Sequence, residues 1–220
     1  MESAGQRLPL PLTPSLKGGR TERSLSLRER AKERGIRAGP SHLPLEAVTQ
    51  LLRNGVTAAD ILEESVFWLL DNYQSFTFFQ ERDLVWTLQT RLTSALKEHR
   101  LHYRVFSEHP MLPGQRRSIS ADLAIVDFHD QVQVAAEFKY EPAHARSDIL
   151  PQKFPVVQWS DVGKDVRRIR DYVKNGIAAT AYAIFIDEAG HFQNHEPPKG
   201  SQWIAWHKDV RVLWTEVHAS

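Results

Sequence analysis

Two carboxylates and a lysine interrupt a stretch of sequence that otherwise has the pattern of buried strands. Asp122 lies in the run ADLAIVD, and Glu137 and Lys139 lie in the run QVQVAAEFKY. Apolar and polar residues alternate in the second run, so Glu137 and Lys139 share one face of a strand, with α carbons roughly 7 Å apart. Two carboxylates can hold a divalent cation, and an ammonium group beside them can offset charge on a substrate.

A polar turn between Asp127 and Gln131 joins the two runs and predicts an antiparallel hairpin. In that pairing Asp122 falls opposite residues 136–138, and therefore beside Glu137. Two bare carboxylates about 4 Å apart would repel by ~4 kcal/mol at an effective dielectric constant near 20. The pairing therefore requires something that relieves the repulsion.

Three arrangements would relieve it. A divalent cation between Asp122 and Glu137 would neutralise both, and Mg²⁺ is often held by only two carboxylates because it keeps most of its waters. A buried salt bridge from Lys139 to either acid would be structural and chemically silent. In a different register the acids would face solvent on opposite edges.

The flanking sequence predicts the elements that must position these residues. The clearest helix covers 80–100, where four leucines form one stripe and Glu81 stands at the amino-terminal end. Three strand-like runs in sequential order predict an antiparallel meander. They cover 101–109, 119–128 and 131–140.

Further elements follow and precede this core. A helix is expected over 161–176, then a strand over 178–190 that is buried on both faces, and a strand or hairpin over 201–217. Two amphipathic helices are expected over 43–55 and 56–73, and the second begins with Thr57 and Asp60 as a capping box. We expect this helical pair, within 41–77, to pack on a domain that covers 78–220.

Composition narrows the possible chemistry. The 220 residues are 41% hydrophobic and include no cysteine, so disulfides and thiolate metal sites are excluded, and any metal must bind to carboxylates or histidines. No apolar run approaches the roughly 20 residues that span a bilayer, and the amino terminus does not resemble a secretory signal. The sequence predicts a cytoplasmic protein that does not bind membranes.

The amino-terminal segment, 1–40, is expected to be disordered and basic. It holds nine Lys or Arg against four Glu, a balance of +5, which leaves the remainder near −4 because the whole chain carries +1. Such an arm could hold a nucleic-acid backbone. It could equally be a solvated leader.

The order of elements and charges resembles the core of the PD-(D/E)XK nuclease superfamily, which has the restriction-endonuclease-like fold. Over about 78–190, Asp122 matches the aspartate of the motif, Glu137 and Lys139 match its E-x-K, and Glu81 matches the helix acid of many members. The resemblance implies an α/β (α+β) fold with a mixed sheet in the order helix-strand-strand-strand-helix-strand. Ala121 stands where the motif has proline, which is a frequent variation.

The recombination-exonuclease branch of this superfamily carries Gln and then Tyr four residues on in the following helix. The corresponding residues here are Arg168 and Tyr172. The first of these departs from the pattern, so the resemblance does not extend to that branch.

The resemblance implies a metal-dependent nuclease that hydrolyses phosphodiester bonds of DNA, rather than RNA, with Mg²⁺ as cofactor and Mn²⁺ as a substitute. Asp122, Glu137 and the backbone carbonyl of Phe138 would hold one or two Mg²⁺, and Glu81 would complete a second metal site. Lys139 would orient or deprotonate the attacking water, or offset charge in the transition state.

Basic residues near this core are candidates for binding the nucleic-acid backbone. Arg146 and Lys153 lie in the long connection 141–160, and Lys164 and Arg168 lie on the helix that follows. The bland reading is that the connection wraps the sheet edge and that the charged helix face is simply solvated.

Two other functions are compatible with the sequence. The fold could serve as a catalytically silent module that binds nucleic acid or a protein, or the three charged residues could form a structural ion-pair cluster. Cleavage of both strands of a duplex would need two sites, which a homodimer would supply.

Overall fold

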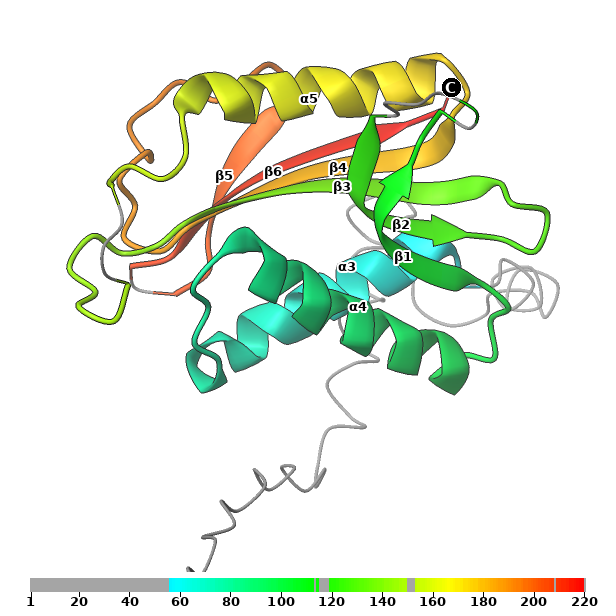
Figure 1. The fold of residues 1–220 in the computed structure, drawn as a ribbon, viewed down its shortest axis with the longest axis horizontal. Coiled ribbons are helices and arrows are strands. Elements are labelled where there is room, and N and C mark those ends of the chain that lie inside the picture. Colours follow the sequence, from blue (N-terminus) through cyan, green and yellow to red (C-terminus); the bar gives the residue numbers. More distant parts are fainter. Residues whose placement is uncertain (1–55, 113, 115–118, 150–152, 208, 220) are drawn as a thin grey trace, which may run out of the picture. The chain divides into compact units, whose positions relative to one another are not determined.

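Six strands form one mixed sheet at the centre of the described part of the chain, a computed structural model that covers residues 56–112, 114, 119–149, 153–207 and 209–219 (Figure 1). These residues all belong to one structural unit, Gly55–Ser220. The helices are α3 (Ala58–Asn72), α4 (Glu81–Glu98) and α5 (Trp159–Lys174), with a short 3-10 turn η1 (Tyr73–Ser75). The strands are β1 (Arg104–Pro110), β2 (Ser120–Val126), β3 (Val132–Glu141), β4 (Ala178–Asp187), β5 (Ser201–Ala205) and β6 (Arg211–His218).

The sheet has the order β1-β2-β3-β4-β6-β5. Strands β3 and β4 are parallel, and the other neighbouring pairs are antiparallel. A parallel pair needs a crossover connection. The chain therefore leaves β3, runs through a connection and α5, and returns to the start of β4. The predicted meander β1-β2-β3 and the carboxy-terminal hairpin β5-β6 are both confirmed.

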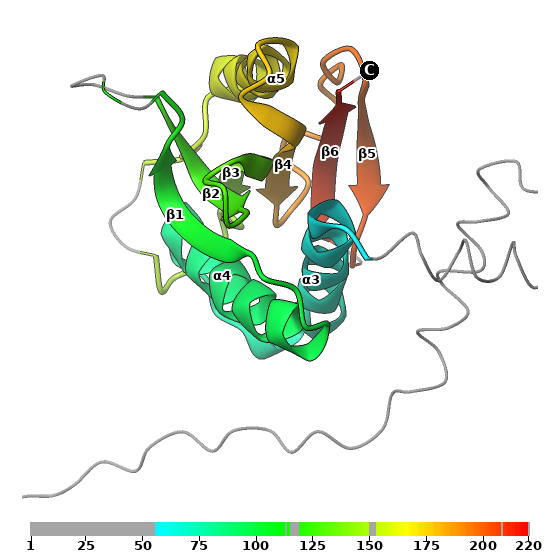
Figure 2. The ribbon, with the colours of Figure 1, turned by 90° about the vertical axis from the view of Figure 1, so that its right-hand side faces the viewer.

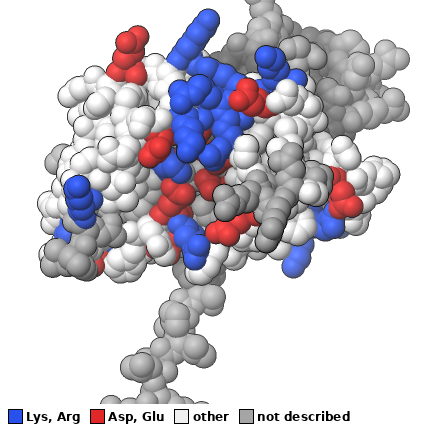
Figure 3. Space-filling model, turned by 45° about the horizontal axis from the view of Figure 1, so that its top comes forward, with Lys and Arg blue, Asp and Glu red and all other residues white. Residues whose placement is uncertain are grey.

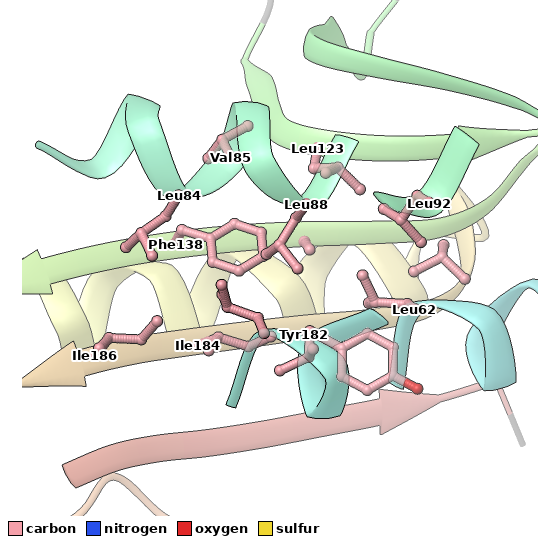
Figure 4. Packing of buried hydrophobic residues seen from close by; sticks show 14 of the residues in the cluster. Leu62, Leu84, Val85, Leu88, Leu92, Leu123, Phe138, Tyr182, Ile184 and Ile186 are labelled. Carbon is pink, nitrogen blue, oxygen red and sulfur yellow. The ribbon is translucent and has the colours of Figure 1, made fainter. Parts of the chain in front are cut away.

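Helices cover both faces of the sheet, with α3 and α4 on one face and α5 on the other (Figure 2). The larger core lies under α3 and α4, where the predicted leucine stripe of α4 meets Phe138 and Tyr182 from the sheet (Figure 4). A second cluster joins α5 to the opposite face through Val166, Ile169 and small residues such as Ala135. The class is therefore mixed α and β, as expected.

Local sequence signals explain where the helices begin and end. The Thr57 hydroxyl accepts a hydrogen bond from the Asp60 N–H, and the Asp60 carboxylate accepts one from the Thr57 N–H, so the predicted capping box of α3 is confirmed. Helix α5 ends at Asn175 and Gly176, and Gly176 takes a φ of +66° that a side chain would resist.

Other expectations meet the limits of the described residues or need adjustment. The basic segment 1–40 and the first predicted helix, 43–55, lie outside the described residues. The second helix, α3, is part of the main core. The alternation expected along 131–140 is interrupted near its start. Val132 packs with the cluster under α5, whereas Val134 packs on the opposite face of the sheet, and the β2–β3 register shifts at this point. No helix among the described residues is both long and apolar enough to cross a membrane.

Candidate functional site

Strands β2 and β3 place Asp122 and Glu137 opposite each other. The register pairs Leu123 with Ala136, so the next residues outward are Asp122 and Glu137. The Asp122 carboxylate accepts a hydrogen bond of 2.7 Å from the Phe138 N–H. The pairing predicted from the sequence is therefore confirmed, and the repulsion between the two acids is a property of the folded chain.

Lys139 lies between acids from two helices. Its Nζ atom is 3.1 Å from Glu81 Oε2, on α4, and 3.2 Å from Asp165 Oδ2, on α5. It also donates a hydrogen bond of 2.7 Å to the Phe138 carbonyl, the group expected as a metal ligand. Burial lowers the pKa of Lys139, but the surrounding carboxylates outweigh burial and raise it. The ammonium group is therefore charged at neutral pH.

Glu137 is the most enclosed acid of the site, with 1% of its surface exposed. Tyr172 OH donates to its Oε1 at 2.8 Å, and Arg168 Nη1 lies 2.9 Å from its Oε2. Burial and then the charge of Asp122 raise the pKa of Glu137 to about 8, against the opposing effects of Arg168 and Tyr172. Glu137 therefore keeps its proton at pH 7.

Glu81 is the first residue of α4, where the helix dipole favours a negative charge. Burial is the main cause that raises the pKa of Glu81 to about 7, and Asp122 adds to it while Lys139 opposes it. The helix start thus delivers a titratable group to the site. Glu81 contacts Lys139 directly, at 3.1 Å.

Asp165 belongs to the site and was missed in the sequence. It is 4% exposed, and its Oδ2 atom lies 3.2 Å from Lys139 Nζ. Burial raises its pKa. The signal was present: Asp165 and Tyr172 fall on the same helical face as Val162, Val166 and Ile169, so a carboxylate was due to be buried there.

The site carries more negative than positive groups. Four carboxylates (Asp122, Glu137, Glu81 and Asp165) surround two cations, Lys139 and Arg168, which leaves a formal charge of −2 when all are ionised. All candidate ligands are oxygens, the kind that Mg²⁺ prefers. This excess of acids over cations fits a divalent cation.

The acids are nevertheless held by protein cations in this structure. Within the described residues, no group of three or more His, Asp or Glu side chains stands close enough to hold a metal ion. Lys139 and Arg168 bridge the carboxylates instead. An ion that entered would therefore have to displace at least one of these two side chains.

The four predicted backbone-binding residues lie in different settings. Lys164 is exposed on α5, and Lys153 is exposed in the connection that precedes it. Arg168 is occupied by Glu137. Arg146 donates to the Phe78 carbonyl at 2.6 Å and pairs with carboxylates, so its role within the fold is to tie the connection down.

Basic side chains form a band over the face that carries α5, and acidic residues lie directly beside it (Figure 3). Along α5 the basic residues are Lys164, Arg167, Arg168, Arg170 and Lys174. Such a band beside an acidic centre would attract a phosphodiester backbone while leaving the acids available for a cation.

The connection between β3 and α5 is fixed by a buried acid that the sequence reading did not single out. Glu141, fully buried at the end of β3, accepts hydrogen bonds from the N–H groups of Val156 and Val157, at 3.1 and 2.7 Å. Its other contact is with His144 Nε2, at 2.6 Å. The long connection is therefore held against the sheet edge.

This arrangement leaves an open pocket next to the acids. The pocket has a volume of about 290 Å³ and lies between the start of α4, the end of β3 and the start of α5. Its lining includes the charged residues Glu81, Lys139 and Asp161 and the apolar residues Phe79, Val156 and Val157. The candidate site thus consists of an acidic centre with an adjoining cavity.

No protein-family model matches the chain, and a search of curated proteins finds no similar sequence.

Proposed function

We propose that this chain is a metal-dependent nuclease of the PD-(D/E)XK type, which hydrolyses phosphodiester bonds of DNA. The observation that carries the proposal is the unbalanced charge of the site. A cluster built only for stability would pair its acids with an equal number of cations, because unpaired buried charge is costly. Here four carboxylates share two cations, and two of the acids have pKa values raised to about 7 and about 8.

The fold supports the same proposal. A helix that carries Glu81 is followed by three antiparallel strands, a crossover helix and a parallel strand. This is the order expected for a restriction-endonuclease-like core. Asp122, Glu137 and Lys139 converge on one face, together with the first residue of α4.

Mg²⁺ would be held by Asp122 and Glu137, with Glu81 and Asp165 as further oxygen donors, and Mn²⁺ would substitute. When bound, such an ion polarises a phosphoryl oxygen and lowers the pKa of a water molecule. The protonated acids of the metal-free site would release their protons as the ion enters. Arg168, freed from Glu137, would lie on the same side as the exposed basic residues of α5.

Lys139 would act as a permanent cation. Its pKa is raised, so it keeps its proton at neutral pH and cannot serve as the base that activates water. It is suited to stabilise the negative charge that builds on the phosphoryl oxygens as water attacks phosphorus and the P–O bond breaks. Glu81, ionised once the ion is bound, would accept the proton of that water.

The test is a cleavage assay on linear, nicked, single-stranded and branched DNA with Mg²⁺, Mn²⁺ or EDTA. We expect cleavage that depends on the metal and falls at least about 100-fold in Lys139→Ala and in Asp122→Asn. Lys97→Ala removes an exposed lysine at the far end of α4 and should leave the rate unchanged. Cleavage that persists in EDTA, or equal rates for wild type and Lys139→Ala, would show that the assignment is wrong.

A silent DNA-binding module is the second candidate, because in this structure each of Glu137, Glu81 and Asp165 already has a cation beside it. Such a module would bind DNA equally well in EDTA and Mg²⁺ and would cleave none of the substrates. Its binding would depend on Lys164 and the band over α5 rather than on Asp122. The nuclease proposal, in contrast, includes a homodimer that acts on both strands of DNA in the cytoplasm. Gel filtration of the protein with DNA tests whether this dimer forms.

A further inference from the structure

The open pocket beside Glu81 and Lys139 has walls of two chemical kinds. Phe79 is 48% exposed and Val156 is 45% exposed, so an aromatic ring and an aliphatic side chain are presented to solvent. The carboxylates of Glu81 and Asp161 stand on the same pocket. A flat, largely apolar group with hydrogen-bond donors at its rim would complement both kinds of wall.

Phe79 is held as a platform. The Arg146 guanidinium lies 5.7 Å from the centre of its ring, and the Phe79 N–H donates to the Asp83 carboxylate at 2.8 Å. Val156 and Val157, which also line the pocket, donate their N–H groups to the Glu141 carboxylate. The apolar part of the lining is therefore held in place by hydrogen bonds, which lowers the entropic cost of binding a ring against it.

The charge of the pocket selects the group that enters. Glu81 belongs to both the pocket and the acidic centre. The carboxylate of Asp161, which also lines the pocket, makes no hydrogen bond or ion pair within the described part of the chain. Lys139 offsets the charge of Glu81, so Asp161 is the acid that remains to repel a phosphate and to accept a hydrogen bond from an amino group. A volume of about 290 Å³ is at the small end of ligand pockets, which run to roughly 1,000 Å³, so one base fits and a duplex does not.

We propose that this pocket binds one unstacked nucleobase with an exocyclic amino group, while the adjoining phosphate faces Lys139. The inference rests on the proposed function and defines its substrate: a DNA strand that is single-stranded or frayed at the nucleotide next to the acidic centre. Phe79 stacks on the base, since stacking on an aromatic side chain tolerates any base. Asp161 accepts the amino group and so distinguishes cytosine from thymine.

Binding can be measured apart from cleavage. Fluorescence anisotropy in EDTA would compare three single-stranded oligonucleotides of one length: oligo(dC), oligo(dT) and a chain of abasic sites. We expect oligo(dC) to bind wild type about tenfold more tightly than the abasic chain and several-fold more tightly than oligo(dT). Phe79→Ala should abolish the first difference, and Asp161→Ala the second.

Matched variants control for general effects on the surface. Phe128→Ala removes a ring that is 74% exposed at the β2–β3 turn, and Asp171→Ala removes an exposed acid from the same helix as Asp161. Both should keep the wild-type preferences, and thermal unfolding shows that each variant is folded. Equal binding of oligo(dC) and the abasic chain by wild type, or a preference for oligo(dC) over the abasic chain that survives in Phe79→Ala, would overturn the pocket assignment.

The two proposals fail separately. Base-dependent binding lost in Phe79→Ala, without cleavage in any metal, would support the pocket and refute the nuclease. Metal-dependent cleavage without base-dependent binding would do the reverse.

Discussion

In the absence of a metal ion, the free energy of unfolding should fall as the pH rises from 5.5 to 8. The pKa of Glu137 is 4.5 in a model peptide and about 8 in the folded chain. Between these values the folded protein holds a proton that the unfolded protein has released, so stability decreases as pH rises. One such proton corresponds to about 1.4 kcal/mol per pH unit, and to roughly 3 kcal/mol over this interval because titration is partial at both of its ends.

The other titrating groups modify this slope without reversing its origin. Glu81 and Asp165 also have raised pKa values and act in the same direction, although Glu81 is one-third exposed and solvent screening reduces its effect. The pKa of His109 is lowered by burial, so its contribution has the opposite sign near pH 6.5. A comparison with a variant that alters only Glu137 removes these shared contributions.

Urea unfolding followed by tryptophan fluorescence measures the effect, because the chain has six tryptophans. The side chain introduced by Glu137→Gln is neutral at every pH and similar in volume. Between pH 5.5 and 8 the stability of this variant should therefore decrease by roughly 2–3 kcal/mol less than that of wild type. Mg²⁺ should stabilise wild type more at pH 8 than at pH 5.5, since the ion requires ionised carboxylates. Parallel pH profiles for wild type and Glu137→Gln would refute the argument that Glu137 is buried with its proton.

Two further predictions concern acids that the sequence reading overlooked. Asp165→Asn should weaken Mg²⁺ binding about tenfold, because a carboxylate beside Lys139 is lost. The affinity is measured from the stabilisation against urea at several Mg²⁺ concentrations, and an unchanged affinity would show that Asp165 is not part of the site. Glu141→Gln should lower the free energy of unfolding by about 2 kcal/mol, because the carboxylate that accepts hydrogen bonds from the Val156 and Val157 N–H groups is lost. The control Glu196→Gln changes an exposed residue and should have no measurable effect. Equal stabilities of the two variants would contradict the anchoring role of Glu141.

The framework of the site was predictable because it depends on local periodicity. Alternation along 131–140 indicates that Glu137 and Lys139 share a face, and the turn from Asp127 to Gln131 brings Asp122 within one residue of Glu137; the register shift between Ile125 and Val126 then decides its partner. These relations involve neighbours in sequence or one tight turn, so few alternative structures compete.

The remaining parts depend on contacts between distant segments. Whether Arg168 reaches Glu137, 31 residues away, depends on how α5 crosses the sheet, and periodicity alone does not define that crossing. The hydrogen bonds from Val156 and Val157 to Glu141 likewise depend on the path of the connection after β3. Asp165 differs, since the helical period placed it on the buried face; attention to the apolar stripe alone concealed a polar member.

The acids and cations of the site come from four elements, β2, β3, α4 and α5, so the excess negative charge exists only when the chain is folded. Folding therefore carries an electrostatic cost, which the apolar contacts of both core clusters must outweigh. A ligand of charge +2 would remove that cost, and its binding energy would appear as added stability. Stability against urea and affinity for Mg²⁺ thus both depend on the excess of acids over cations in the site. A substitution that removes one carboxylate should stabilise the metal-free protein and weaken the binding of Mg²⁺.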